Sequence, residues 1–187
     1  MAQALNRQAG IVSDTQESIA WYALRVRSRH EKKIAALLEQ KNIEISLPLL
    51  QVTRQWSDRK KLIQVPLFRG YVFTRIPMQL KRFEVLQTTG AVAFSGICGK
   101  IKPIPDEQMY WLDQFLHGGE EIELESDFPT GQRVRVTHGP WRGIEGIVLE
   151  TRASKRLVIW LDALMQGMSV NLDAAMLEPL NRERRIQ

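Results

Sequence analysis

The sequence predicts an α+β protein of two parts: an antiparallel sheet flanked by helices, followed by a small C-terminal β-barrel. Two observations lead to this prediction. Between residues 21 and 116, extended stretches of alternating apolar and polar residues are interleaved with three stretches of helical spacing, in the order β-α-β-β-α-β-α. From Gly131 onward only short stretches of strand alternation remain, separated by glycine and proline, which is typical of a small barrel.

The N-terminal part begins with a polar stretch. Residues 1–20 hold few large apolar side chains at no regular period, so we expect a disordered tail. Residues 21–27 predict a half-buried strand, because Arg25 and Arg27 share one parity while Leu24 and Val26 share the other. Ser28 and Glu31 have the spacing of a capping box, and the apolar residues behind them predict a helix that ends near Asn42.

A charged hairpin and four further elements complete this part of the chain. The extended stretches 43–52 and 62–76 flank the basic segment 54–61, which predicts a long hairpin with a charged tip. A short helix, two short strands over 91–104 and a last helix ending near Leu116 follow.

An acidic linker separates the two parts. Residues 117–130 contain two adjacent glycines, five acidic residues and no Lys or Arg, so we expect an extended, mobile segment. The barrel is expected over 131–180 and a basic tail over 181–187. Outside the linker the chain has 26 basic residues against 16 acidic ones. This balance suits a partner of nucleic acid or of a nucleic-acid machine, and equally an ordinary solvated surface.

The composition excludes several classes of protein. A single cysteine, Cys98, which we expect in a short apolar strand as an inert core thiol, and three isolated histidines exclude a disulfide framework and a metal site. No apolar run reaches the ~20 residues of a membrane span, and no signal-peptide core is present. We therefore expect a cytoplasmic monomer with no membrane contact. In the absence of a phosphate-binding glycine loop or a nucleophile motif, we predict no enzyme activity and no cofactor.

Two sets of motifs resemble one family. The C-terminal part reads Gly131-x-x-Val134-x-Val136-x-x-Gly139-Pro140-Trp141-x-Gly143-x-x-Gly146-x-Val148. This spacing resembles the KOW motif of NusG proteins and of some ribosomal proteins. The N-terminal part contains four segments in the order of the NusG N-terminal domain: Trp21-Tyr22, 66–73, 89–94 and 102–108. This second resemblance covers residues 21–116, with one departure, because Arg69 stands where the family usually has a proline.

The resemblance implies a transcription elongation factor with three contact surfaces. RNA polymerase, through its clamp helices, is expected at Phe68, Gly70, Tyr71 and Phe73. The non-template and upstream DNA of the elongation complex is expected at Arg25, Arg27, Arg29, Lys33 and Thr88. Rho or a small-subunit ribosomal protein is expected at Gly139, Pro140, Trp141 and Leu164. For Phe73 a place in the core is favoured over the interface, and for Phe68 and Tyr71 the interface. For the basic set a solvated face, and for Trp141 a cap on the barrel core, are equal alternatives.

Three functions within this resemblance stay open. The run 55–61 resembles specialised antiterminator paralogues of the RfaH and capsule-operon type, which implies antipausing or antitermination on specific long operons. Housekeeping NusG, which couples polymerase to Rho or the ribosome, is the alternative, and a ribosomal or RNA-binding KOW protein is a further one. The glycines and β-branched residues between Gly131 and Leu172 predict a pre-formed barrel that swings freely on its linker with Trp141 accessible.

Overall fold

The computed structural model describes residues 18–55, 59–118, 122–125, 131–150 and 155–180. Four of the predicted features therefore lie partly or wholly outside the described residues: the N-terminal tail up to residue 17, the hairpin tip at 56–58, most of the acidic linker and the tail 181–187. Within the described part of the chain, no helix is long and apolar enough to cross a membrane.

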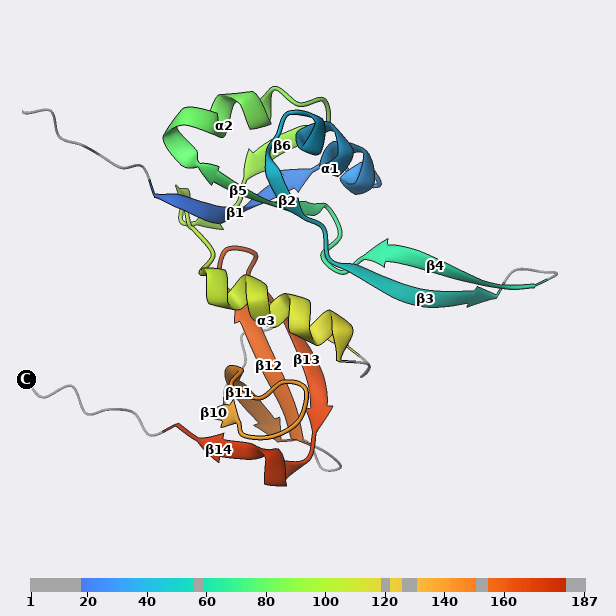
Figure 1. Cartoon of the computed structure of the whole chain (residues 1–187), viewed down its shortest axis with the longest axis vertical. Coiled ribbons are helices and arrows are strands. Elements are labelled where there is room, and N and C mark those ends of the chain that lie inside the picture. The colour runs from blue at the N-terminus through green and yellow to red at the C-terminus, as the bar shows by residue number, and fades with distance from the viewer. Residues whose placement is uncertain (1–17, 56–58, 119–121, 126–130, 151–154, 181–187) are drawn as a thin grey trace, which may run out of the picture.

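The N-terminal domain is built on a four-stranded antiparallel sheet with two helices against one side (Figure 1). Its strands lie in the order β2-β5-β1-β6. Their bounds are β1 (Ile19–Val26), β2 (Glu44–Ser46), β5 (Tyr71–Pro77) and β6 (Ala91–Phe94). The helices are α1 (Glu31–Gln40) and α2 (Met78–Leu86). The first strand begins two residues earlier than predicted, so residues 19 and 20 belong to the sheet and not to the tail.

A separate two-stranded ribbon extends from this domain (Figure 1). It pairs β3 (Leu49–Gln55) with β4 (Lys60–Pro66). The prediction of one extended stretch over 62–76 is wrong, because the chain turns between β4 and β5 and Gly70 adopts φ +80° there. Glycine reaches this conformation without a Cβ clash. The ribbon and the main sheet are therefore distinct elements joined by this turn.

Two short strands and a helix lead out of the domain. The strands are β7 (Gly96–Ile97) and β8 (Lys100–Ile101), and the helix is α3 (Asp106–His117). The prediction for Cys98 is wrong, because this residue is exposed in the turn between the two strands with φ +49°. The turn leaves its thiol at the surface and outside the core.

The C-terminal domain is all β, as predicted. Six antiparallel strands form one sheet in the order β14-β10-β11-β12-β13-β9. They are β9 (Glu123–Glu125), β10 (Gln132–Val136), β11 (Glu145–Glu150), β12 (Lys155–Leu161), β13 (Gln166–Leu172) and β14 (Leu177–Pro179), with a 3₁₀ turn, η1 (Ala174–Met176), before the last. The prediction of a wholly mobile linker is wrong for 123–125, because β9 pairs with β13.

Helix α3 connects the cores of the two domains. One apolar cluster holds α1, α2 and one face of the main sheet. A second cluster runs from the other side of the N-terminal domain, through α3, into the C-terminal domain. In the second cluster Trp141 is only 3% exposed, and its ring centroid lies 5.5 Å from that of Phe115. The Trp141 indole Nε1 donates a hydrogen bond of 3.2 Å to the carbonyl of Gln114.

The predicted free swing of the C-terminal domain is therefore wrong for this conformation. A buried indole brings a large apolar area and needs an acceptor for its N–H, and α3 supplies both an apolar face and a carbonyl. A second bridge joins the domains, since the hydroxyl of Ser95 donates a hydrogen bond of 2.6 Å to the carbonyl of Ala163. Figure 1 shows α3 lying between the sheet of the N-terminal domain and the strands of the C-terminal domain.

Substitution of Gly118 by alanine tests this packing. A Cβ at Gly118 would lie 2.3 Å from Nε1 of Trp141, while its φ of −71° is acceptable to alanine. Overpacking of this kind costs about 1–3 kcal/mol, so we expect Gly118→Ala to separate the domains in a large fraction of molecules. ¹⁵N relaxation should then give two rotational correlation times in place of one. Gln87→Ala is the matched control, because Gln87 is also a helix C-cap with a similar φ of −73°. A single correlation time for Gly118→Ala would contradict the packing.

Candidate functional site

The aromatic segment predicted to contact polymerase is mostly internal. Phe68 and Phe73 are 1% and 0% exposed, and their rings pack edge to face with centroids 5.9 Å apart. The core position favoured for Phe73 is confirmed, whereas the surface position favoured for Phe68 is wrong in this conformation. Tyr71 is half-buried at the start of β5 and packs against the same cluster. The structure thus gives Tyr71 an accessible part and places both phenylalanines behind it.

Both backbone polar groups of Gly70 form hydrogen bonds. Its N–H donates to Oε1 of Glu31 at 2.8 Å, and its carbonyl accepts the N–H of Val26 at 2.8 Å. Glu31 is only 6% exposed, so its carboxylate faces inward toward this turn. The predicted capping box is wrong, because His30 is the N-cap of α1 and its side chain gives no capping hydrogen bond to the helix. The spacing of Ser28 and Glu31 in the sequence gave no sign that Glu31 fixes a turn 39 residues away.

The residues predicted to contact DNA share one corner, with one exception. Arg25 is exposed between buried neighbours on β1, as the alternation predicted, and Arg27 and Arg29 follow in the exposed loop before α1. The N–H of Arg27 donates to the carbonyl of Gly90 at 2.9 Å, which brings the loop after α2 to the same corner. Lys33 is exposed on α1.

Thr88 does not present its side chain at this corner. It is 4% exposed, and its hydroxyl accepts a hydrogen bond of 2.8 Å from Nζ of Lys41. The same hydroxyl donates to the carbonyl of Glu84 at 3.4 Å. Its hydrogen-bonding capacity is used within the domain, so direct contact with DNA by Thr88 would require a change of this packing.

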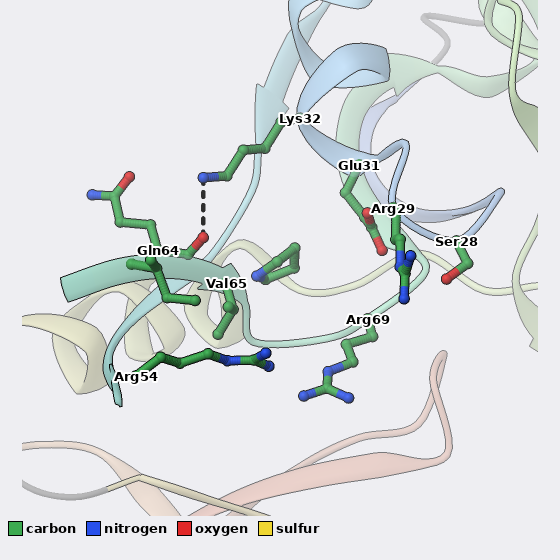
Figure 2. A pocket seen from close by; sticks show the side chains of 10 residues that line it. Ser28, Arg29, Glu31, Lys32, Arg54, Gln64, Val65 and Arg69 are labelled. Atoms are coloured by element: carbon green, nitrogen blue, oxygen red, sulfur yellow. Dashed lines mark hydrogen bonds between the residues drawn. The ribbon is translucent and has the colours of Figure 1, made fainter. Parts of the chain in front are cut away.

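A pocket of about 620 Å³ lies next to this corner, between the start of α1 and the base of the ribbon (Figure 2). Arg29, Lys32, Arg54 and Arg69 line it. Of the residues predicted to contact DNA, only Arg29 takes part. Arg54 comes from β3 and Arg69 from the turn before Gly70, so the pocket joins segments that are distant in the sequence. Their separation along the chain explains why no local motif predicted this pocket.

The residues predicted to bind a second partner through the C-terminal domain are divided. Gly139 and Pro140 are exposed in the loop after β10, where Gly139 adopts φ +85°. Trp141 and Leu164 are buried, at 3% and 6% exposure. The four residues therefore do not form one exposed surface while the domains are packed together. Among the residues that the structure describes, no group of three or more metal-ligating side chains is found.

Comparisons with known proteins agree on one family. The family model described as transcription termination factor nusG matches residues 19–112. NusG of Staphylococcus carnosus is 27% identical over 176 residues, covering 86% of this chain and 95% of that protein. NusG of Pasteurella multocida is 23% identical over 183 residues, covering 91% of this chain and 100% of that protein. Both relatives are named as transcription termination/antitermination proteins.

A solved structure has the same fold. It is that of Thermotoga maritima NusG, described for its domain interaction, with a TM-score of 0.50 and 22% sequence identity. The similarity covers 88% of this chain and 98% of that chain, so it includes both domains. The predicted combination of an N-terminal α+β domain and a C-terminal β domain is confirmed.

Removal of the Glu31 carboxylate should weaken the turn at Gly70. Glu31→Ala leaves the half-buried N–H of Gly70 without its acceptor, which should cost about 1–3 kcal/mol of unfolding free energy. Glu31→Gln keeps an acceptor and should lose less. Glu39→Ala is the matched control, because Glu39 is exposed on the same helix. Urea unfolding followed by circular dichroism measures the difference, and equal midpoints for Glu31→Ala and Glu39→Ala would contradict the role of this hydrogen bond.

Proposed function

Since the chain belongs to the NusG family of transcription termination/antitermination factors, we propose that it binds RNA polymerase through its N-terminal domain and acts by contact, with the polymerase clamp helices as its target. The observation that carries this proposal is the match of the family model to residues 19–112, which span β1 to most of α3. Family members are transcription factors and not enzymes, which agrees with a chain that acts by binding.

Tyr71 is the anchor of this contact. Its ring is partly accessible, and the peptide before it is fixed by the hydrogen bonds of Gly70 to Glu31 and Val26. Aromatic side chains that are rigidly held before binding lose little conformational entropy and are frequent hot spots of protein interfaces. Phe68 and Phe73 support the segment from within the cluster that also includes α3.

The basic corner gives the second contact of the proposal, with non-template and upstream DNA. Arg25, Arg27, Arg29 and Lys33 are all exposed. Guanidinium groups fit phosphate oxygens in a bidentate manner. Such contacts position a protein on DNA without reading the base sequence of the DNA. Thr88 stays in the proposal only as a residue next to this surface, because its hydroxyl is bonded to Lys41.

We place the chain with the specialised antiterminators that assist polymerase on long operons. Two features of the sequence support this placement, namely the run 55–61 and Arg69 in place of the usual proline. Trp141 and Leu164 are buried in this conformation, so neither side chain is available to Rho or a ribosomal protein while the domains are packed together. A housekeeping NusG is the second candidate. A ribosomal or RNA-binding KOW protein is disfavoured, because the family match lies in the N-terminal domain.

Tyr71→Ala should weaken binding to core RNA polymerase by about 1–3 kcal/mol, the usual range for an aromatic anchor at an interface. Biolayer interferometry with immobilised polymerase measures the change. Tyr110→Ala is the matched control, because Tyr110 is 61% exposed on α3 and outside the proposed surface. An unchanged thermal midpoint shows that the fold is intact. Wild-type affinity in a folded Tyr71→Ala variant would refute the proposed contact.

Transcription in vitro separates the two candidate functions. On a long template with pause sites and a Rho-dependent terminator, an antiterminator should increase the yield of full-length RNA in the presence of Rho. A housekeeping factor should leave the yield unchanged or lower it, because it assists Rho. The Tyr71→Ala variant serves as the control for an effect that needs polymerase contact.

A further inference from the structure

The pocket at the start of α1 has two walls (Figure 2). One wall is the loop and first turn of α1, and the other is the end of β4 with Ile63, Val65 and Pro66. Nζ of Lys32 donates a hydrogen bond of 3.0 Å to the carbonyl of Gln64 and ties the two walls together. At about 620 Å³ the pocket has the size of a small-ligand site.

Positive charge in this pocket exceeds negative charge, because three arginines and Lys32 line it against the single carboxylate of Glu31. The guanidinium groups of Arg29, Arg54 and Arg69 line it, and no ion pair or hydrogen bond of these three side chains is found among the described residues. Glu31 is the only carboxylate in the lining, and it is buried and bonded to Gly70. Figure 2 shows the side chains of Arg54 and Arg69 extending toward the same space. Three such groups raise the local concentration of anions.

The ribbon register independently indicates an anionic partner. Arg54 pairs directly with Lys61 across the two strands, and both side chains are exposed. Like charges opposite each other in a sheet are destabilising. A bound polyanion would offset this repulsion. As the cross-strand partner of Arg54, Lys61 lies on the same face of the ribbon and extends the positive charge beyond the pocket itself.

We propose that this pocket binds the phosphodiester backbone of a nucleic-acid strand, with Arg29, Arg54 and Arg69 on phosphate oxygens. The start of α1 favours the same ligand, because its N-cap offers no side-chain acceptor to the first amides of the helix. Ile63, Val65 and Pro66 provide an apolar wall for sugar or base. A strand with one charge per nucleotide matches the row of Arg69, Arg54 and Lys61 better than a single acidic side chain does.

This inference rests on the proposed function, which brings the chain to the elongation complex, and it adds a contact. The DNA surface predicted from the sequence shares only Arg29 with the pocket. Arg69, which departs from the pattern of the family, places its charge directly before the turn that carries Tyr71. The pocket therefore lies between the proposed polymerase anchor and the basic corner.

Fluorescence anisotropy of the full chain with a labelled oligonucleotide tests the proposal. The three arms are single-stranded DNA, duplex DNA and single-stranded RNA of one sequence, and they identify the source of the phosphodiester. We expect Arg54→Gln/Arg69→Gln to weaken binding about tenfold in at least one arm. The slope of log affinity against log salt should decrease by about 0.7 per lost contact with a single strand. Arg54→Lys/Arg69→Lys should keep most of the slope, since it keeps the charge.

The matched control is Lys102→Gln/Arg142→Gln, which removes the same charge from exposed positions outside the pocket. Equal affinities of this control and the pocket variant in all three arms would overturn the proposal. Polymerase association is measured separately by interferometry. If the pocket variant loses only that association, the pocket contacts an acidic protein surface and the nucleic-acid proposal is wrong. If wild-type chain binds oligonucleotide through the pocket but fails to bind polymerase, the proposed function fails and this inference stands.

Discussion

The hydrogen bonds of Gly70 are the constraint on which both proposed contact surfaces depend. Its N–H bonds to Glu31 at the start of α1, and its carbonyl bonds to Val26 at the end of β1. The residue before it lines the basic pocket, and the residue after it is the aromatic anchor. Because Gly70 adopts φ +80°, the chain can reverse here without a Cβ clash. One turn therefore sets the positions of Arg69 and Tyr71 relative to α1.

The second constraint is α3, which is packed on both sides. Its apolar residues Met109, Leu112 and Phe115 belong to the same cluster as Phe68 on one side and Trp141 on the other. A change in packing on either side of α3 therefore displaces residues of one continuous apolar core, since packed interiors transmit small displacements. This arrangement explains why the C-terminal domain is not an independent unit in this conformation, although its own strands are complete.

The sequence predicted those features that depend on local pattern. The α1 and α3 helices, the alternation around Arg25 and the strands of the C-terminal domain follow from the periodicity of apolar residues. The features that sequence reasoning missed depend on contacts across long stretches of chain. Glu31 looked like part of a capping box, but its carboxylate is used by Gly70, and Trp141 looked accessible until α3 supplied its acceptor. The pocket could not be predicted either, because Arg54 and Arg69 come together only through the fold.

The departure at Arg69 now has a physical explanation. A proline at this position would fix its own φ and stiffen the turn. The bond between Glu31 and Gly70 already restrains the turn from outside the segment, so its geometry does not depend on a proline. Position 69 can therefore carry a charged side chain in place of a proline ring. The arginine present there places its guanidinium in the lining of the pocket. A single residue before Gly70 thus changes what the turn can bind while the aromatic anchor after Gly70 stays in place.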